Sequence, residues 1–133
     1  MTTKFATIIF DEKNKIVEII FNGVPSDSKN TAHICEIEKF MYEMNCIYDK
    51  YKKFNLLFNA TQVGFVSMKH LKKISKFFQE KDDETKEKVR KCAIVVKYTI
   101  FKNMVNFALS LKTPVCEVKT FSDRTQAILF SML

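Results

Sequence analysis

Residues 92–98 read Cys-Ala-Ile-Val-Val-Lys-Tyr, an almost wholly apolar run of strand length that is rich in β-branched residues. Such a run is typical of a central strand in a parallel sheet, where helices cover both faces. Thr99 follows and can cap a helix. That helix would carry one apolar stripe of Ile100, Met104, Phe107, Ala108 and Leu111, and Pro114 would end it. A buried strand followed by an amphipathic helix predicts an α/β fold.

The first half of the chain shows the same alternation of strands and helices. Two short apolar runs, Phe5–Phe10 and Ile16–Phe21, flank the polar segment Asp11–Lys15 and predict a β-hairpin. Ser26, Asp27 and Ser28 then offer caps for a long helix. Its apolar face is expected to consist of Ile34, Ile37, Met41, Met44, Ile47, Tyr48 and Tyr51. Asn55–Ala60 follows as a buried strand.

The second half adds two further helices and a last strand around residues 92–98. Thr61–Val66 is expected to form a turn, and Ser67 to cap a helix with Leu71, Ile74, Phe77 and Phe78 inward. The charged stretch Glu80–Lys91 is interpreted as the frayed end of that helix and a solvated loop. Val115–Phe121 is the last expected strand, and Ser122 caps a short helix carrying Ala127, Phe130 and Leu133. The predicted order is β-β-α-β-α-β-α-β-α, a mostly parallel sheet that opens with an antiparallel pair.

Length and composition indicate one domain over residues 1–133 that stays in the cytosol. The chain is 47% hydrophobic and 28% charged, as globular domains are. No apolar run approaches the ~18 residues of a membrane span, and Phe5–Phe10 is too short for a signal-peptide core. Cys35 and Cys46 fall on one helix face but about 16 Å apart, so no metal or disulfide site is predicted. No cofactor motif is present.

Three stretches resemble the STAS superfamily, including its SpoIIAA-like branch. They are 57–67, with the end of a strand and the turn after it; 92–111, the buried strand and helix; and 118–129, the last strand and the start of the last helix. The order of elements is also the one expected of that superfamily. The resemblance implies a regulatory domain that binds other proteins.

The same resemblance implies a phosphorylation switch in the turn before the second helix, where related anti-sigma-factor antagonists carry Asp-Ser-Ser-Gly-Leu. With Leu71 placed on the Leu of that motif, Met68 and Lys69 occupy the two Ser positions and the acceptor hydroxyl is lost. A gap of one residue would instead restore Ser67 as the acceptor. Asn59 stands where the superfamily often has an acidic residue.

The second helix carries the candidate binding surface. Helical spacing places Lys69, Lys72, Lys73 and Lys76 on one side, next to Ser67 and Met68 in the turn. The net charge of +7 also arises wholly from Ser67 onward. We expect this basic face to hold a protein partner, with an acidic partner as one option, although a solvated helix face is the simpler alternative.

Other classes of function find less support in the sequence. His33 and His70 have no carboxylate or nucleophile at a useful spacing, and no phosphate-binding glycine loop exists, which predicts a protein that is not an enzyme. With only Arg90 and Arg124, sequence-specific nucleic-acid binding is not expected. The second hypothesis is a carrier or sensor of a small anionic or apolar ligand, a lipid or nucleotide. Phe101, Met104 and Phe107 would line its pocket or simply fill the core.

Overall fold

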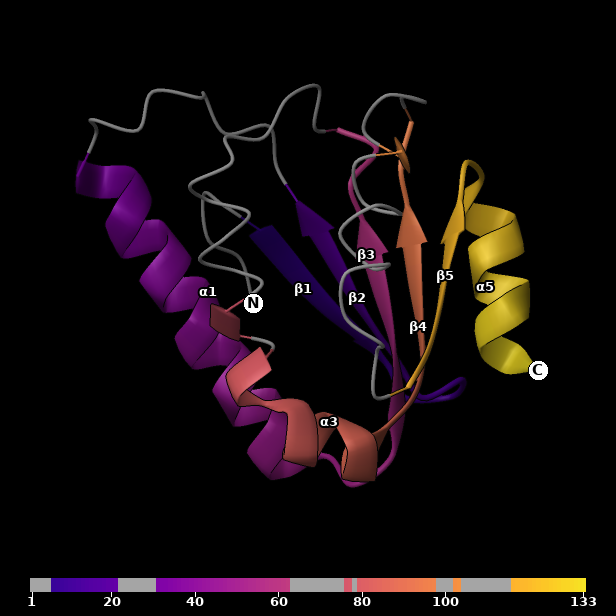
Figure 1. Ribbon diagram of the computed structural model, residues 1–133, viewed down its shortest axis with the longest axis horizontal. Helices are drawn as coiled ribbons and strands as arrows, with labels where there is room; N and C mark the ends of the chain where they lie inside the picture. The colour runs from indigo at the N-terminus through magenta and orange to yellow at the C-terminus, as the bar shows by residue number, and fades with distance from the viewer. Residues whose placement is uncertain (1–5, 22–30, 63–75, 78, 98–101, 104–115) are drawn as a thin grey trace.

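The protein forms one sheet with helices on both of its faces (Figure 1). The structure, a computed structural model, describes residues 6–21, 31–62, 76–77, 79–97, 102–103 and 116–133, with side chains of the first helix from residue 38 onward. The strands are β1 (Ala6–Asp11), β2 (Ile16–Phe21), β3 (Phe54–Asn59), β4 (Val89–Val95) and β5 (Glu117–Phe121). The helices are α1 (Thr31–Lys50), α3 (Asp82–Lys88) and α5 (Arg124–Met132).

The sheet has the strand order β1-β2-β3-β4-β5. β1 pairs with β2 in antiparallel fashion, whereas β2, β3, β4 and β5 are parallel to one another. The side chain of Asp11 accepts hydrogen bonds from the backbone and side-chain amides of Asn14, and these bonds shape the β1–β2 turn. The predicted mixed α/β fold, mostly parallel with an opening hairpin, is therefore confirmed.

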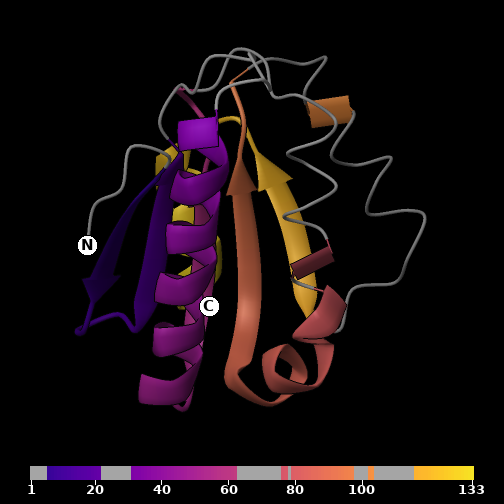
Figure 2. The ribbon, with the colours of Figure 1, turned by 90° about the vertical axis from the view of Figure 1, so that its left-hand side faces the viewer.

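The first face of the sheet packs against α1. In Figure 2 this helix crosses in front of the sheet, and α5 lies behind it. Phe40, Met44 and Tyr48 of α1 are fully buried there against Val17 and Leu56. The predicted stripe included Met44, Ile47 and Tyr48 and omitted Phe40. A second buried aromatic therefore widens the apolar face of this helix.

The opposite face packs against α5, which covers β3, β4 and β5. Ala127 and Phe130 of the helix contact Leu57, Ala93 and Val95 of the strands. Burial on both faces explains the apolar runs Leu56–Phe58 in β3 and Cys92–Val95 in β4. No helix in the described part of the chain is long and apolar enough to cross a membrane.

One charged stretch was interpreted wrongly from the sequence. Residues 82–88 form the regular helix α3, and β4 begins at Val89 instead of Cys92. Val89 pairs with Phe54 and is buried in the core beneath α1. The expected solvated loop was therefore wrong, because one buried Val among charged residues is enough to start a strand when a neighbouring strand supplies its partner.

Two details of the last helix also differ from the sequence prediction. Asp123, not Ser122, is the N-cap, and its carboxylate accepts a hydrogen bond from the backbone N–H of Thr125. Leu133, which the prediction placed on this helix with Ala127 and Phe130, is the C-cap and is 85% exposed, whereas the helix turns Ala127, Phe130 and Ser131 toward the sheet. Residues 76–77 and 79–80 are helical and Phe77 is buried, as predicted, whereas most of the second and third predicted helices lie outside the described residues.

A buried hydrogen bond links α1 to α3. The hydroxyl groups of Tyr48 and Thr85 lie 2.8 Å apart, and both residues are buried. We expect Tyr48→Phe to lower the free energy of unfolding by about 1–2 kcal/mol, since the Thr85 hydroxyl loses its buried partner. In the Tyr48→Phe variant, Thr85→Val should lower the free energy of unfolding by less than it does in the wild type, because it removes a hydroxyl that has already lost its partner. Denaturant unfolding of both single variants and the double variant measures this, and strictly additive costs would contradict it.

Candidate functional site: a buried ion pair at the ends of the parallel strands

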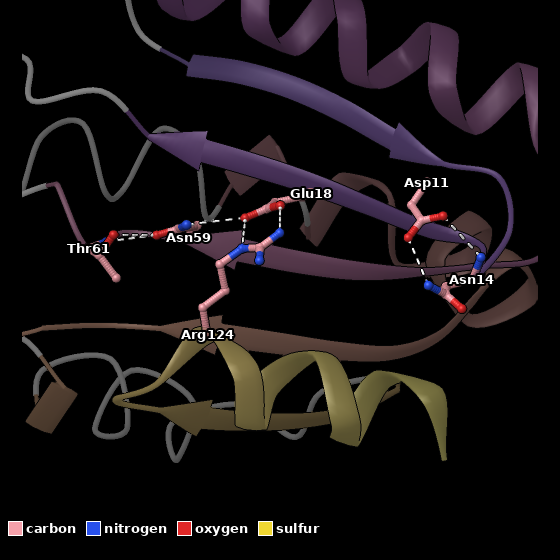
Figure 3. A network of polar contacts seen from close by, with 6 residues as sticks. All are labelled: Asp11, Asn14, Glu18, Asn59, Thr61 and Arg124. Carbon is pink, nitrogen blue, oxygen red and sulfur yellow. Dashed lines mark hydrogen bonds and ion pairs between the residues drawn. The ribbon is translucent and has the colours of Figure 1, made fainter.

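A buried carboxylate lies on the face of β2 that α5 covers. The side chain of Glu18 is 8% exposed, and Arg124, the first residue of α5, reaches across the sheet to it (Figure 3). Arg124 Nε donates to Glu18 Oε2 at 2.9 Å, and its Nη2 donates to Oε1 at 2.6 Å. This two-point contact matches the planar fork of guanidinium to the two oxygens of a carboxylate.

Asn59 extends the network to the end of β3. Its Nδ2 donates to Glu18 Oε2 at 3.2 Å. Its Oδ1 accepts two hydrogen bonds from Thr61, one from the backbone N–H at 3.1 Å and one from Oγ1 at 2.7 Å. Asn59 thus connects the ion pair to the first residues of the segment that leads toward residue 67. An acid here, which the STAS resemblance implied, would place a second carboxylate against Glu18.

The network holds Glu18 in its ionised form. Hydrogen bonds from Arg124 lower the pKa of the Glu18 carboxyl below its usual value, with a further contribution from Asn59, and they outweigh the opposing effect of burial. The same contact raises the pKa of the Arg124 guanidinium. With donors on both of its oxygens, Glu18 is poorly suited to act as a general acid or base.

α5 is also held at its far end. Asn55 Nδ2 donates to the carbonyl of Ser131 at 2.9 Å, and Lys91 Nζ donates to the carbonyl of Phe130 at 3.3 Å. The Lys91 ammonium lies 4.9 Å from the centre of the Phe130 ring as well. The first and last turns of this helix are therefore attached to β2, β3 and β4 by side chains.

The predicted binding residues are only partly within the described chain. Lys76 is exposed at the end of the second predicted helix. The other five, Ser67, Met68, Lys69, Lys72 and Lys73, lie outside the described residues, and their role as a partner surface stays a prediction.

Three other titratable groups, buried Tyr48 and Cys92 and half-buried Cys116, are held in their protonated forms. Burial raises the pKa of the Cys92 thiol well above its usual value and raises that of Cys116 as well. Burial also raises the pKa of Tyr48 to about 12. Cys46, Cys92 and Cys116 are free thiols. Among the residues that the structure describes, no group of three His, Cys, Asp or Glu side chains is arranged to hold a metal ion.

Sequence reasoning missed the role of Glu18. The residue is the only charged position in the strand Ile-Val-Glu-Ile-Ile-Phe, and an acid in the middle of a central strand is a signal for a paired, buried charge. Its partner could not be inferred in the same way, because Arg124 lies 106 positions away. Only the packing of α5 on the sheet brings the two together.

The strand order and the packing of α1 and α5 on opposite faces of the sheet define an α/β domain. The family model described as SpoIIAA-like matches residues 16–130, a span that includes Glu18, Asn59 and Arg124. The chain therefore belongs to the SpoIIAA-like family, which confirms the resemblance seen in the sequence.

The structural comparison agrees with this assignment. The fold is similar to that of an uncharacterised DUF3478-family protein with a SpoIIAA-like fold from Shewanella loihica PV-4, with a TM-score of 0.66 and 13% sequence identity. The similarity covers 94% of this chain and 90% of that one. At this identity the likeness supports the fold alone. No curated protein matches the sequence.

The ion pair predicts a contribution to stability that acid removes. Because the pKa of Glu18 is lower in the folded chain than in the unfolded one, its stabilising effect is complete above about pH 4.5 and is lost as the pH falls through the lower, folded value. We expect Glu18→Gln to be less stable than the wild type at neutral pH, but with a smaller loss of stability on acidification.

Urea unfolding at several pH values from about 7 to about 2 measures this difference. Arg124→Met leaves Glu18 without its cation and should likewise reduce the loss of unfolding free energy on acidification. A wild-type slope in both variants would contradict the assigned role of the pair.

Proposed function

We propose that this chain is a non-catalytic regulatory module that binds a protein partner through the turn at residues 63–69 and the basic helix face that follows it. The observation that supports the proposal best is the polar network at the end of β3, where the chain leaves the sheet at Thr61. Arg124 and Asn59 both donate hydrogen bonds to the buried carboxylate of Glu18, and Asn59 holds Thr61 at the point where the chain leaves β3. A turn held by a rigid scaffold is a common way to present a recognition surface.

The state of the reactive groups supports a binding role over a catalytic one. Catalytic carboxylates and thiols need a pKa suited to proton transfer or nucleophilic attack. Here Glu18 is ionised and bonded through both oxygens, while burial raises the pKa of the thiols of buried Cys92 and half-buried Cys116. Each of these groups is therefore in a protonation state that suits a structural role better than proton transfer or nucleophilic attack.

The charge of the surface supports an acidic partner. The whole excess of positive charge arises from residue 67 onward, and Lys76 at the end of the basic face is exposed. Opposite charge across an interface accelerates association and makes affinity depend on salt.

We predict that the triple variant Lys69→Glu, Lys72→Glu, Lys73→Glu keeps the fold and binds the partner at least about tenfold more weakly, a loss of about 1.4 kcal/mol or more. The partner is first identified by cross-linking in extracts of the native cells and is then purified. Calorimetry with the purified pair gives the dissociation constant at low and high salt.

A matched control reverses the same amount of charge elsewhere. Lys13, Lys52 and Lys86 are exposed and precede β2, β3 and β4, at the opposite end of the parallel strands. The control triple variant to Glu should bind nearly as the wild type does. Equal losses in both triple variants, or none in the first, would argue against the proposed surface.

The carrier hypothesis makes a different prediction. A ligand present at 100 times its dissociation constant adds about 2.7 kcal/mol to the stability of the folded state. We expect no such stabilisation in a thermal-shift screen of nucleotides, acyl lipids and phospholipid head groups, because the proposed partner is a protein. A clear shift with one of these compounds would favour the carrier function.

A further inference from the structure

The network joins two parts of the chain that lie far apart in the sequence, the start of α5 and the end of β3 (Figure 3). We propose that it couples them: the contact of Arg124 with Glu18 sets the orientation of Asn59 and so the conformation in which Thr61 enters the turn. Where that turn binds a partner, as proposed above, the position of the first turn of α5 would then influence the affinity for the partner.

The first step rests on the two different ends of the Asn59 amide. Its nitrogen faces the carboxylate of Glu18, and its oxygen faces the donors of Thr61. A half-turn of the amide would place its oxygen against the carboxylate and its N–H groups against the backbone N–H of Thr61. The charge of Glu18 therefore selects the one orientation in which Asn59 can hold Thr61.

The second step concerns what holds the carboxylate. Glu18 receives hydrogen bonds from Arg124 on both oxygens and from Asn59 on Oε2 alone. Without Arg124, only one of these three hydrogen bonds remains for the nearly buried charge, so the carboxylate must turn toward other donors or admit water. Either movement shifts the acceptor on which Asn59 depends. Arg124 itself is 52% exposed, so it can be reached from solvent while Glu18 cannot.

The third step is that the effect stays local. Ala127 and Phe130 are buried against the sheet, and Asn55 and Lys91 hold the last turn of α5 by its carbonyls. Loss of the Arg124 contact therefore loosens the first turn of the helix without detaching the helix. The first turn of α5 should therefore respond to loss of the Arg124 contact, whereas the last turn should keep its own contacts.

Hydrogen exchange measured by NMR tests the coupling without any partner. In Arg124→Met we expect the backbone N–H of Thr61 to exchange about tenfold faster, within the range usual for coupled sites. The backbone N–H of Asn55, which donates to the Lys15 carbonyl at 2.8 Å at the other end of β3, should exchange at its wild-type rate. Gln126→Met, which changes an exposed residue in the same turn of α5, serves as the control and should alter neither rate.

Coupling must also act in the reverse direction. Thr61→Val removes one donor to Asn59 Oδ1 and should speed exchange of the Arg124 Nε–H. Thr61 is only partly buried, so this variant keeps the test available if Arg124→Met fails to fold. An unchanged Thr61 rate in folded Arg124→Met, or an unchanged Arg124 rate in Thr61→Val, would overturn the proposal. Equal acceleration at Thr61 and Asn55 would do so too, because it signals a global loss of stability. None of these outcomes bears on whether the turn binds a partner.

Discussion

The carboxylate of Glu18 lies on the sheet face that packs against α5, next to the apolar cluster formed by Leu57, Ala93 and Val95. A charge in that position needs donors, and water cannot supply them once the helix is in place. The chain meets the requirement with a guanidinium from the first residue of the helix and an amide from the adjacent strand. The ion pair fixes where the first turn of the helix lies, and the contacts of Asn55 and Lys91 fix its last turn, so polar side chains add direction to an apolar contact that has little of its own.

The same constraint acts on the first residues after β3. Asn59 is shared between the ion pair and Thr61, so the segment leaving the strand depends on a contact made by the far end of the chain. The carboxylate of this site comes from the middle of β2, whereas the STAS resemblance implied an acid at position 59. In this chain Glu18 of β2 therefore carries the charge, and position 59 carries an amide that bonds to it.

Much of the fold was predictable because buried residues recur along the sequence with the spacing of a helix or a strand. The hairpin, the long first helix and the buried runs of β3 and β4 were predicted close to their observed positions, since each has an apolar pattern that only one type of element satisfies. The start of β4 was missed because Val89 stands alone among charged residues, and its burial depends on Phe54 of the neighbouring strand. The cap of α5 was missed because Ser122 and Asp123 are both good capping residues and adjacent in sequence.

By itself, the sequence determined the fold class, the order of strands and helices, and the presence of a lone acid in an apolar strand, because these follow from local pattern and residue chemistry. It also determined the basic excess from residue 67 onward. Only the tertiary structure decided that Glu18 and Arg124 meet, that Asn59 bridges them to Thr61, and that Leu133 faces outward. Those facts depend on how α5 lies across the sheet, and a contact between residues 106 positions apart leaves no periodic trace in a single chain.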